Sequence, residues 1–259
     1  MVDSHAVSEL EDARTGELAA RLKALRERID AACAAAKRES AEVGLIAVTK
    51  FFPAADVLRL LRLGLTEFGE NRDQEAAAKA AQVADTLARA QAADPGAPIL
   101  AAVRPRWHFI GQLQTNKVRS VVSYADVVQS VDRLKLVAAL DQSAARAGRT
   151  PACLVQVNLD PDAAGRGGAE PADVERIADA VAESAALRLG GLMAVAPLGT
   201  DPRPAFERLA QLAAKVRGAH PEAVSLSAGM SGDLEQAIAA GATHVRIGSA
   251  LLGRRPPLR

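Results

Sequence analysis

The feature that most constrains the fold is a regular alternation of short apolar runs with longer helical patterns. Eight runs have strand character, because they are short, rich in aliphatic residues and bounded by polar or turn-forming residues. They cover residues 44–49, 67–68, 107–110, 127–129, 152–157, 190–194, 223–226 and 243–247. Helical patterns lie between them, at residues 54–63, 72–89, 114–121, 133–147, 173–184, 204–216 and 233–240. Eight β-then-α units predict an α/β fold, a (β/α)8 barrel of the TIM type, with an open doubly wound sheet as the alternative.

A further helical pattern at residues 8–40 precedes the first strand and predicts an extra N-terminal helix packed on the barrel. No break in composition marks a second domain, so residues 1–259 are predicted to form a single domain, as barrels of about 250 residues do. Residues 90–105 contain several proline and glycine breakers and predict a surface loop. We expect residues 1–7 and 254–259 to be frayed tails.

Charge composition narrows the class of partner. The 32 basic and 31 acidic residues nearly cancel, so no overall field favours nucleic acid or a membrane surface, and a small molecule is the expected partner. No run approaches about 20 apolar residues and the amino terminus lacks a signal-peptide pattern, which predicts a soluble, cytoplasmic protein. Cys33 and Cys153 have no metal-type spacing, so we expect two free core thiols and no metal site.

Lys50 is the first candidate functional residue. It follows the apolar run 45–49 and precedes the break at Phe51-Phe52-Pro53. Burial at a strand tip disfavours the ammonium form and lowers the pKa of a lysine, so such a residue can form a Schiff base as a neutral nucleophile. The alternative is a surface lysine whose amine extends from the strand end into solvent.

The segments after the last two strands predict a phosphate site. Ser231 precedes a helical pattern and is a candidate N-cap, and the N–H groups and dipole of a first helical turn favour an anion. Gly248 and Ser249 precede a second short helical segment that would point to the same place. Phosphate sites after the seventh and eighth strands recur in such barrels, and ordinary helix capping is the alternative for each serine taken alone.

Arg246 lies inside the eighth apolar run, where a guanidinium is costly unless it meets a partner. Two interpretations stay open: an ion pair with a buried carboxylate, and a hydrogen bond to the aromatic ring nitrogen of a bound cofactor, which would keep that nitrogen unprotonated. His108 is flanked by two aromatic residues and is expected to be a core residue satisfied by a neighbour. A role for His108, Asn116 or Lys117 at a pocket mouth stays open.

Six segments in this order resemble the pyridoxal-phosphate homeostasis proteins, single-domain relatives of the barrel domain of alanine racemase. They are AVTK (47–50), FGEN (68–71), WHFIGQLQTNK (107–117), GLM (191–193), SAGMS (227–231) and VRIGS (245–249). The resemblance extends from about Leu18 to Gly253 and implies the barrel of pyridoxal phosphate fold type III. It also implies that Lys50 carries pyridoxal 5′-phosphate (PLP) as an internal aldimine and that Arg246 faces the pyridine nitrogen. The other cofactor-binding residues that it implies are Asn71, Ser227, Gly229, Ser231, Gly248 and Ser249, with the serines and Gly248 around the phosphate.

The same resemblance implies a protein of intracellular PLP homeostasis, a monomer or weak dimer that stores PLP, hands it to PLP-dependent apoenzymes and affects amino-acid and keto-acid balance. No catalytic residue and no established turnover are expected. Racemases of this ancestry use a second acid-base group, a tyrosine from an added domain of a neighbouring subunit. The one tyrosine here, Tyr124, lies in an apolar stretch, and we expect no such domain after the barrel. The alternatives are a weak PLP-dependent amino-acid racemase or lyase, and a lysine Schiff-base aldolase that binds a sugar phosphate.

Overall fold

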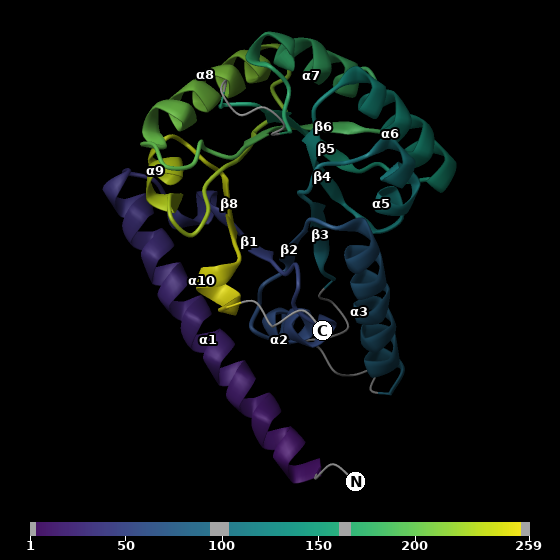
Figure 1. Ribbon diagram of the computed structural model, residues 1–259, viewed down its shortest axis with the longest axis vertical. Helices are drawn as coiled ribbons and strands as arrows, with labels where there is room; N and C mark the ends of the chain where they lie inside the picture. The colour runs from purple at the N-terminus through teal and green to yellow at the C-terminus, as the bar shows by residue number, and fades with distance from the viewer. Residues whose placement is uncertain (1–3, 94–103, 161–166, 255–259) are drawn as a thin grey trace.

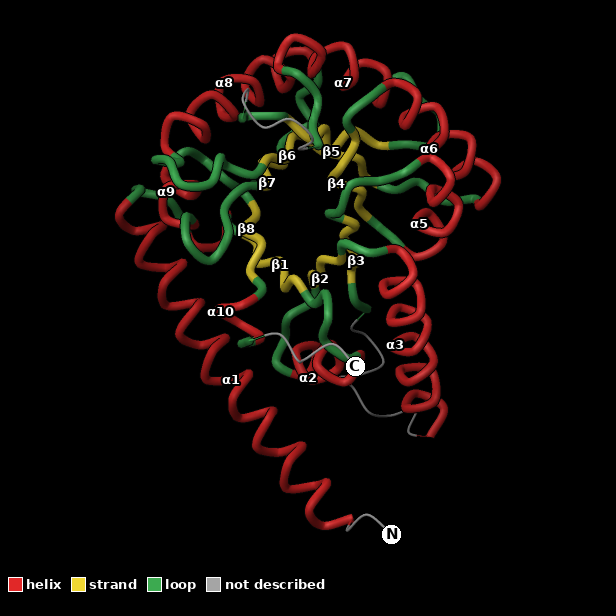
Figure 2. Tube along the Cα trace, viewed as in Figure 1, coloured by secondary structure: helices red, strands yellow, loops and turns green. Residues whose placement is uncertain are grey.

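The fold is a closed barrel of eight parallel strands surrounded by helices (Figure 1, Figure 2). The computed structural model describes residues 4–93, 104–160 and 167–254, and their side chains from residue 13 onward. The strands are β1 (Gly44–Val48), β2 (Glu67–Glu70), β3 (Arg106–Phe109), β4 (Val127–Val131), β5 (Ala152–Val157), β6 (Arg188–Ala194), β7 (Ser225–Ser227) and β8 (His244–Ile247). The α-helices are α1 (Ser4–Ala35), α2 (Ala54–Arg62), α3 (Asp73–Ala93), α5 (Val118–Tyr124), α6 (Leu134–Ala147), α7 (Val174–Ala182), α8 (Arg203–Ala219), α9 (Leu234–Ala239) and α10 (Ser249–Leu252). Short 3-10 turns lie at Ser40–Glu42, Thr115–Lys117 and Pro171–Asp173.

The predicted barrel and the extra N-terminal helix are therefore confirmed, and the open sheet is wrong. The barrel closes because β1 pairs in parallel with β8, with Gly44 opposite His244 and Ala47 opposite Ile247. This register brings the carboxyl ends of β1 and β8 together at one edge. The residues that follow these two strands, Lys50 and Gly248-Ser249, consequently lie on the same side of the barrel.

Two segments that the sequence predicts to be irregular are partly helical. The loop expected at residues 90–105 starts later, because α3 continues to Ala93 through the strongly helix-forming sequence ARAQAA at 88–93. The rest of that loop, residues 94–103, lies outside the described residues. The tail expected at residues 1–7 is helical from Ser4, whereas residues 1–3 and 255–259 also lie outside the described part.

Helix α1 covers one side of the barrel with a regular apolar stripe. Leu18, Leu22, Leu25 and Ile29 recur at helical spacing, and each is at most 4% exposed. Full burial of one such side chain stabilises a fold by about 1.5–3 kcal/mol. The helix contacts α9, α10 and α2, so it joins the end of the barrel to its beginning (Figure 1).

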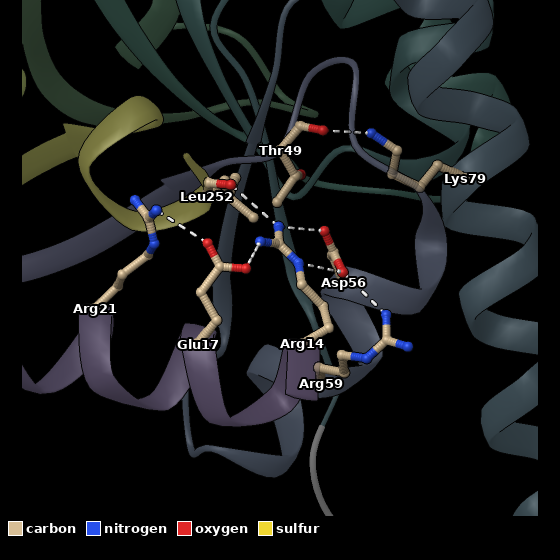
Figure 3. Close-up of polar contacts among 8 residues, drawn as sticks. All are labelled: Arg14, Glu17, Arg21, Thr49, Asp56, Arg59, Lys79 and Leu252. Atoms are coloured by element: carbon tan, nitrogen blue, oxygen red, sulfur yellow. Dashed lines mark hydrogen bonds and ion pairs between the residues drawn. The ribbon is translucent and has the colours of Figure 1, made fainter. Parts of the chain in front are cut away.

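Arg14 of α1 connects α1 to both α2 and α10 by hydrogen bonds. Its Nη2 atom lies 2.8 Å from Oδ2 of Asp56 in α2 and 3.1 Å from the carbonyl oxygen of Leu252 in α10 (Figure 3). Asp56 is 3% exposed and also accepts a hydrogen bond from Arg59 at 3.0 Å. The carboxylate is thus paired despite its burial, as a charge in that position must be.

The remaining sequence expectations concern cysteines and membranes. Cys33 and Cys153 are free and buried, as predicted. Burial raises the pKa of the Cys153 thiol to about 12. Among the described helices, none has the length and apolarity needed to cross a membrane.

Candidate functional site

A cavity of about 280 Å³ opens at the carboxyl ends of β1, β7 and β8. This is near the lower end of the range of about 300–1,000 Å³ that small-molecule sites occupy. Two basic side chains, Lys50 and Arg246, line it, and none of its lining residues is acidic. The complete lining consists of Val48, Lys50, Phe52, Met230, Ser231, Gly232, Arg246, Gly248, Ser249 and Gly253. Five of the eight residues proposed from the sequence are therefore brought together here.

Lys50 stands on a tight turn between β1 and α2, and it is half-buried. The next residue, Phe51, has a φ of 70°, which an L-residue other than glycine adopts at a cost of about 1–2 kcal/mol. Two contacts hold it there: its backbone N–H donates to the Glu75 carboxylate, and the Arg72 guanidinium lies 5.0 Å from the centre of its ring. The lysine is therefore presented by a constrained turn and not by a loose loop.

The buried ion pair of Lys79 and Glu70 stabilises this turn through the backbone of Thr49. The Nζ atom of Lys79 lies 2.7 Å from the carbonyl oxygen of Thr49 and 2.6 Å from Oε1 of Glu70, and the first of these contacts is drawn in Figure 3. The Thr49 hydroxyl donates to the same Glu70 oxygen at 2.7 Å. Burial raises the pKa of Glu70, and the charge and hydrogen bond of Lys79 work against that rise. The sequence pattern did not reveal this pair, because Lys79 lies on a helix whose other polar residues are mostly exposed.

Arg246 is 4% exposed and its guanidinium is bound on two sides. Nη1 donates to the carbonyl oxygen of Ser227 at 2.7 Å and to the Ser227 hydroxyl at 2.8 Å, and Nη2 donates to the carbonyl oxygen of Ala194 at 2.8 Å. Burial lowers the pKa of Arg246 to about 10, so the group remains charged at neutral pH. Among residues 13–93, 104–160 and 167–254, the partners of this guanidinium are thus one hydroxyl and two carbonyl oxygens, and none is a carboxylate. The ion-pair interpretation of Arg246 was therefore wrong for the described residues.

The segment after β7 differs from the expected cap. Helix α9 begins at Leu234 with Asp233 in the N-cap position, so the prediction that Ser231 caps this helix was wrong. A turn intervenes, in which the Asp233 carboxylate accepts the backbone N–H of Met230 at 2.6 Å. Ser231 still lines the cavity, and its carbonyl oxygen accepts a hydrogen bond from Arg28 of α1 at 2.8 Å. The segment after β8 agrees with the prediction, because α10 starts at Ser249 with Gly248 as its N-cap.

Three of the proposed site residues do not line the cavity. The Ser227 hydroxyl is fully buried and bonds to Gln129 and Arg246. Gly229 has a φ of 91°, and an added Cβ would lie 2.6 Å from Ala237 Cβ, so only glycine fits there. Its carbonyl oxygen accepts the backbone N–H of Arg246 at 2.9 Å, which holds the arginine strand in place. Asn71 follows β2, and its Oδ1 atom is buried without a hydrogen-bond partner in the described residues.

The segment around His108 is part of the core, as expected. His108 is 3% exposed and bonds to Glu67 and Gln129, while Trp107 and Phe109 are 5% and 2% exposed. Asn116 and Lys117 lie in a 3-10 turn and do not line the cavity. Over the residues that the structure describes, no cluster of histidine, cysteine and carboxylate side chains could hold a metal ion.

Comparison with known proteins agrees with this geometry. Residues 20–256 match the family model described as the alanine racemase N-terminal domain. The chain is 44% identical over 251 residues to the pyridoxal phosphate homeostasis protein of Mycobacterium tuberculosis, which covers 93% of this chain and 94% of that one. It is 35% identical over 244 residues to the protein of the same name from Escherichia coli K12, with coverage of 92% and 97%.

Solved structures give the same result. The PLP-bound structure of PipY from Synechococcus elongatus is similar with a TM-score of 0.75 and 34% identity, and the match covers 92% of this chain and all of PipY. The alanine racemase of Streptomyces coelicolor shares the fold alone, with a TM-score of 0.67 and 21% identity over 92% of this chain and 58% of the racemase. The chain therefore belongs to the alanine racemase N-terminal domain family and, within it, to the pyridoxal phosphate homeostasis proteins.

Proposed function

We propose that this chain binds PLP in the cavity at the carboxyl ends of β1, β7 and β8 and serves PLP homeostasis. The single observation that carries the proposal is that half-buried Lys50 and buried Arg246 line one small cavity that has no acidic lining residue. A phosphorylated aldehyde requires an amine for the aldehyde and hydrogen-bond donors for the phosphate; Lys50 offers the amine, and Ser231, Gly248 and Ser249 offer the donors. PipY, at 34% identity, has been solved with PLP bound, which supports the same assignment.

Each of the eight site residues proposed from the sequence has a role that fits its position. When bound, PLP supplies an aldehyde that joins a primary amine covalently with loss of water, and Lys50 offers that amine. Arg246 stays charged and can only donate, so it suits an unprotonated ring nitrogen. Ser231, Gly248 and Ser249 would bind the phosphate with hydroxyl and backbone N–H groups. Asn71 would lie beside the cofactor, whereas Ser227 and Gly229 would act by fixing Arg246.

A storage and handover role fits this site better than racemisation. A two-base racemase needs a second acid-base group opposite the lysine. The one tyrosine of the chain, Tyr124, lies on α5 and does not line the cavity. Burial raises the pKa of Tyr124 well above the usual range, so it is a poor proton donor or acceptor. We therefore propose a cytoplasmic protein, one domain and a monomer or weak dimer, that stores PLP and releases it to PLP-dependent apoenzymes.

The test is covalent trapping. Protein incubated with PLP and then reduced with borohydride should gain one PLP adduct in its intact mass, and peptide mapping should locate it on Lys50. Lys50→Ala should lose the adduct, whereas Lys215→Ala, a matched change on the exposed part of α8, should keep it. An adduct on another residue, or none, would refute the assignment; failure to take up PLP would favour the aldolase alternative.

A second measurement addresses turnover. Long incubation of the PLP-loaded protein with single enantiomers of alanine and serine, followed by chiral chromatography, should show no conversion above that of the Lys50→Ala variant. Conversion at rates typical of metabolic enzymes would instead establish the racemase alternative.

A further inference from the structure

A row of buried polar side chains crosses the interior of the barrel. We call it the interior chain; it consists of Glu67 on β2, His108 on β3, Gln129 on β4, Ser227 on β7 and Arg246 on β8. Four of the five are at most 4% exposed. It starts at Glu67, the first residue of β2, crosses the barrel between Gln129 on β4 and Ser227 on β7, two strands that are not neighbours (Figure 2), and ends at Arg246 in the candidate cofactor cavity.

Each link of the interior chain is a hydrogen bond. Arg246 Nη1 lies 2.8 Å from Ser227 Oγ, and Ser227 Oγ lies 2.7 Å from Gln129 Oε1. Gln129 Nε2 lies 2.8 Å from His108 Nδ1, and His108 Nε2 bonds to the carboxylate of Glu67. Buried polar groups normally have hydrogen-bond partners, but one partner near in space is enough for each. Here the bonds instead connect side chains from five strands in one continuous series.

The donor and acceptor types fix one direction along the interior chain. A guanidinium only donates and a carboxylate only accepts, so the two ends are set. The Gln129 amide nitrogen donates to His108 Nδ1, which leaves Nε2 of a neutral ring to donate to Glu67. The Ser227 hydroxyl accepts from Arg246 and donates to the Gln129 carbonyl oxygen. All four bonds therefore donate from Arg246 toward Glu67, and hydrogen bonds aligned in this way polarise one another in a low dielectric.

The environment of His108 agrees with a neutral ring. Burial lowers the pKa of His108, although the Glu67 carboxylate works in the opposite direction. The groups that face it are Glu67, Arg106 and Asp126, and the His244 ring lies 6.5 Å away between centroids. Burial alone would raise the pKa of Glu67, but its hydrogen bond to His108 leaves the pKa lowered, so its charge is present at neutral pH.

We propose that His108 and Gln129 are positioning residues for Arg246, which join its guanidinium to the Glu67 carboxylate across the barrel interior. Through Ser227 they fix one N–H of the guanidinium and thus set which of its other N–H groups point to a ligand ring. For PLP as that ligand, the inference rests on the function proposed above. The hydrogen-bond order itself holds in the protein without cofactor and can be measured there.

The first arm of the test measures the interior chain in the cofactor-free protein. Nitrogen NMR of the His108 ring should show one neutral tautomer with the proton on Nε2 at neutral pH. Glu67→Gln, at a side chain that is 22% exposed, removes the negative end with little change in volume. It should shift the Arg246 guanidinium nitrogen signals although the two residues are not in contact. The opposite tautomer in the wild-type protein, or unmoved Arg246 signals in the variant, would overturn the proposal.

The second arm measures cofactor affinity. Gln129→Leu removes the acceptor for the Ser227 hydroxyl and should weaken PLP binding by about three- to tenfold, the effect of one net hydrogen bond, and shift the near-visible absorption maximum. Gln156→Leu is the matched control, because Gln156 lies on neighbouring β5 and donates to the carbonyl of Gly167, outside the interior chain. Gln129→Glu keeps an acceptor for Ser227 but removes the N–H that donates to His108 Nδ1, so nitrogen NMR should show a proton on Nδ1 in this variant; an Nδ1 that stays unprotonated would overturn the assigned order.

The outcomes separate the two proposals. If the wild-type protein takes up no PLP, the proposed function fails, and the NMR arm alone decides on the interior chain. If PLP binds equally to wild type, Gln129→Leu and Gln156→Leu, the positioning role is refuted while the PLP assignment stands. Should Gln129→Leu not fold, Glu67→Gln replaces it in the affinity measurement, with an expected loss of about two- to threefold.

Discussion

Replacing Lys79 with methionine is the sharpest test of how the Lys50 turn is held. The ammonium of Lys79 contacts the carboxylates of Glu70 and Glu75 and the carbonyl oxygen of Thr49. The side chains of Lys79 and Glu70 are 5% and 0% exposed. Methionine keeps the length and most of the volume, so the variant isolates the loss of the charge and its hydrogen bonds from the creation of a cavity.

The expected loss of stability is large for a single substitution. Removing one partner of a buried ion pair costs about 3–5 kcal/mol, because the other charge stays buried without compensation. A typical domain has a free energy of unfolding of about 5–15 kcal/mol, so the variant should fold but be clearly weakened. In Lys79→Met/Glu70→Gln both charges are gone, and the double variant should be more stable than Lys79→Met alone.

Urea unfolding followed by circular dichroism measures this. At neutral pH the midpoint of Lys79→Met should fall by about 1 M or more. Lys23→Met is the matched control, because Lys23 pairs with Glu27 four positions away on a helix, as Lys79 does with Glu75, but the Lys23 and Glu27 side chains are 78% and 63% exposed. Its midpoint should stay where it is in the wild type.

The stability loss of Lys79→Met should also depend on pH, in a direction that Glu70 determines. Loss of Lys79 removes the charge that opposes the raised pKa of Glu70, so the folded-state pKa rises further above its ordinary value of 4.5. For a raised carboxyl pKa, protons favour the folded state; this contribution is present below the unfolded pKa and is lost as pH rises through the folded one. The stability deficit of Lys79→Met should therefore shrink between neutral pH and about pH 5. A deficit that is small at neutral pH, or that grows on acidification, would refute the reasoning.

Three further predictions follow from the site and the core. The pair Ser231→Ala and Ser249→Ala should weaken PLP retention during dialysis by about 1.5–3 kcal/mol per lost hydrogen bond to the phosphate, and unchanged retention would place the phosphate elsewhere. Cys153, whose burial raises its pKa to about 12, should react with a thiol reagent at mildly alkaline pH only after unfolding, so rapid labelling of the native protein would contradict its core position. Burial and the neighbouring His108 lower the pKa of His244 from 6.5 to about 4. The contribution of His244 to stability is therefore present above pH 6.5 and is lost as pH falls toward 4. An NMR titration of His244 with a midpoint near 6.5 would disprove this.

The sequence predicted the strands well, because buried parallel strands are short apolar runs between turn residues. The errors lie at the ends of strands, where polar residues begin or finish them. β2 continues to Glu70, whose Oε1 atom accepts hydrogen bonds from Lys79 and Thr49. β7 starts at Ser225 and not at Ala223, and Val224, which looks like a strand residue, is 57% exposed. Such polar positions join a strand only when a distant partner binds them, and one sequence does not reveal that partner.

The candidate site also contains some residues that the sequence identified and others whose partners it could not reveal. Lys50 and Ser249 were identified from strand-end positions, since the carboxyl ends of barrel strands meet at one edge. The alternative of an ion pair for Arg246 could not be dismissed in advance, because carbonyl oxygens from β6 and β7 satisfy the guanidinium and a carbonyl leaves no mark in a sequence. Ser231 failed as a cap because Asp233, two residues later, takes the helix start.

The contact of Arg14 with the Leu252 carbonyl joins residues 238 positions apart, and β1 pairs with β8 over a similar span. Contacts between distant segments form late, because a long loop must close before they stabilise anything. During synthesis, the apolar stripe of α1 and one edge of β1 therefore lack their native neighbours until the eighth strand has left the ribosome. For this period the nascent barrel exposes apolar surface and an unpaired strand edge, both of which favour aggregation.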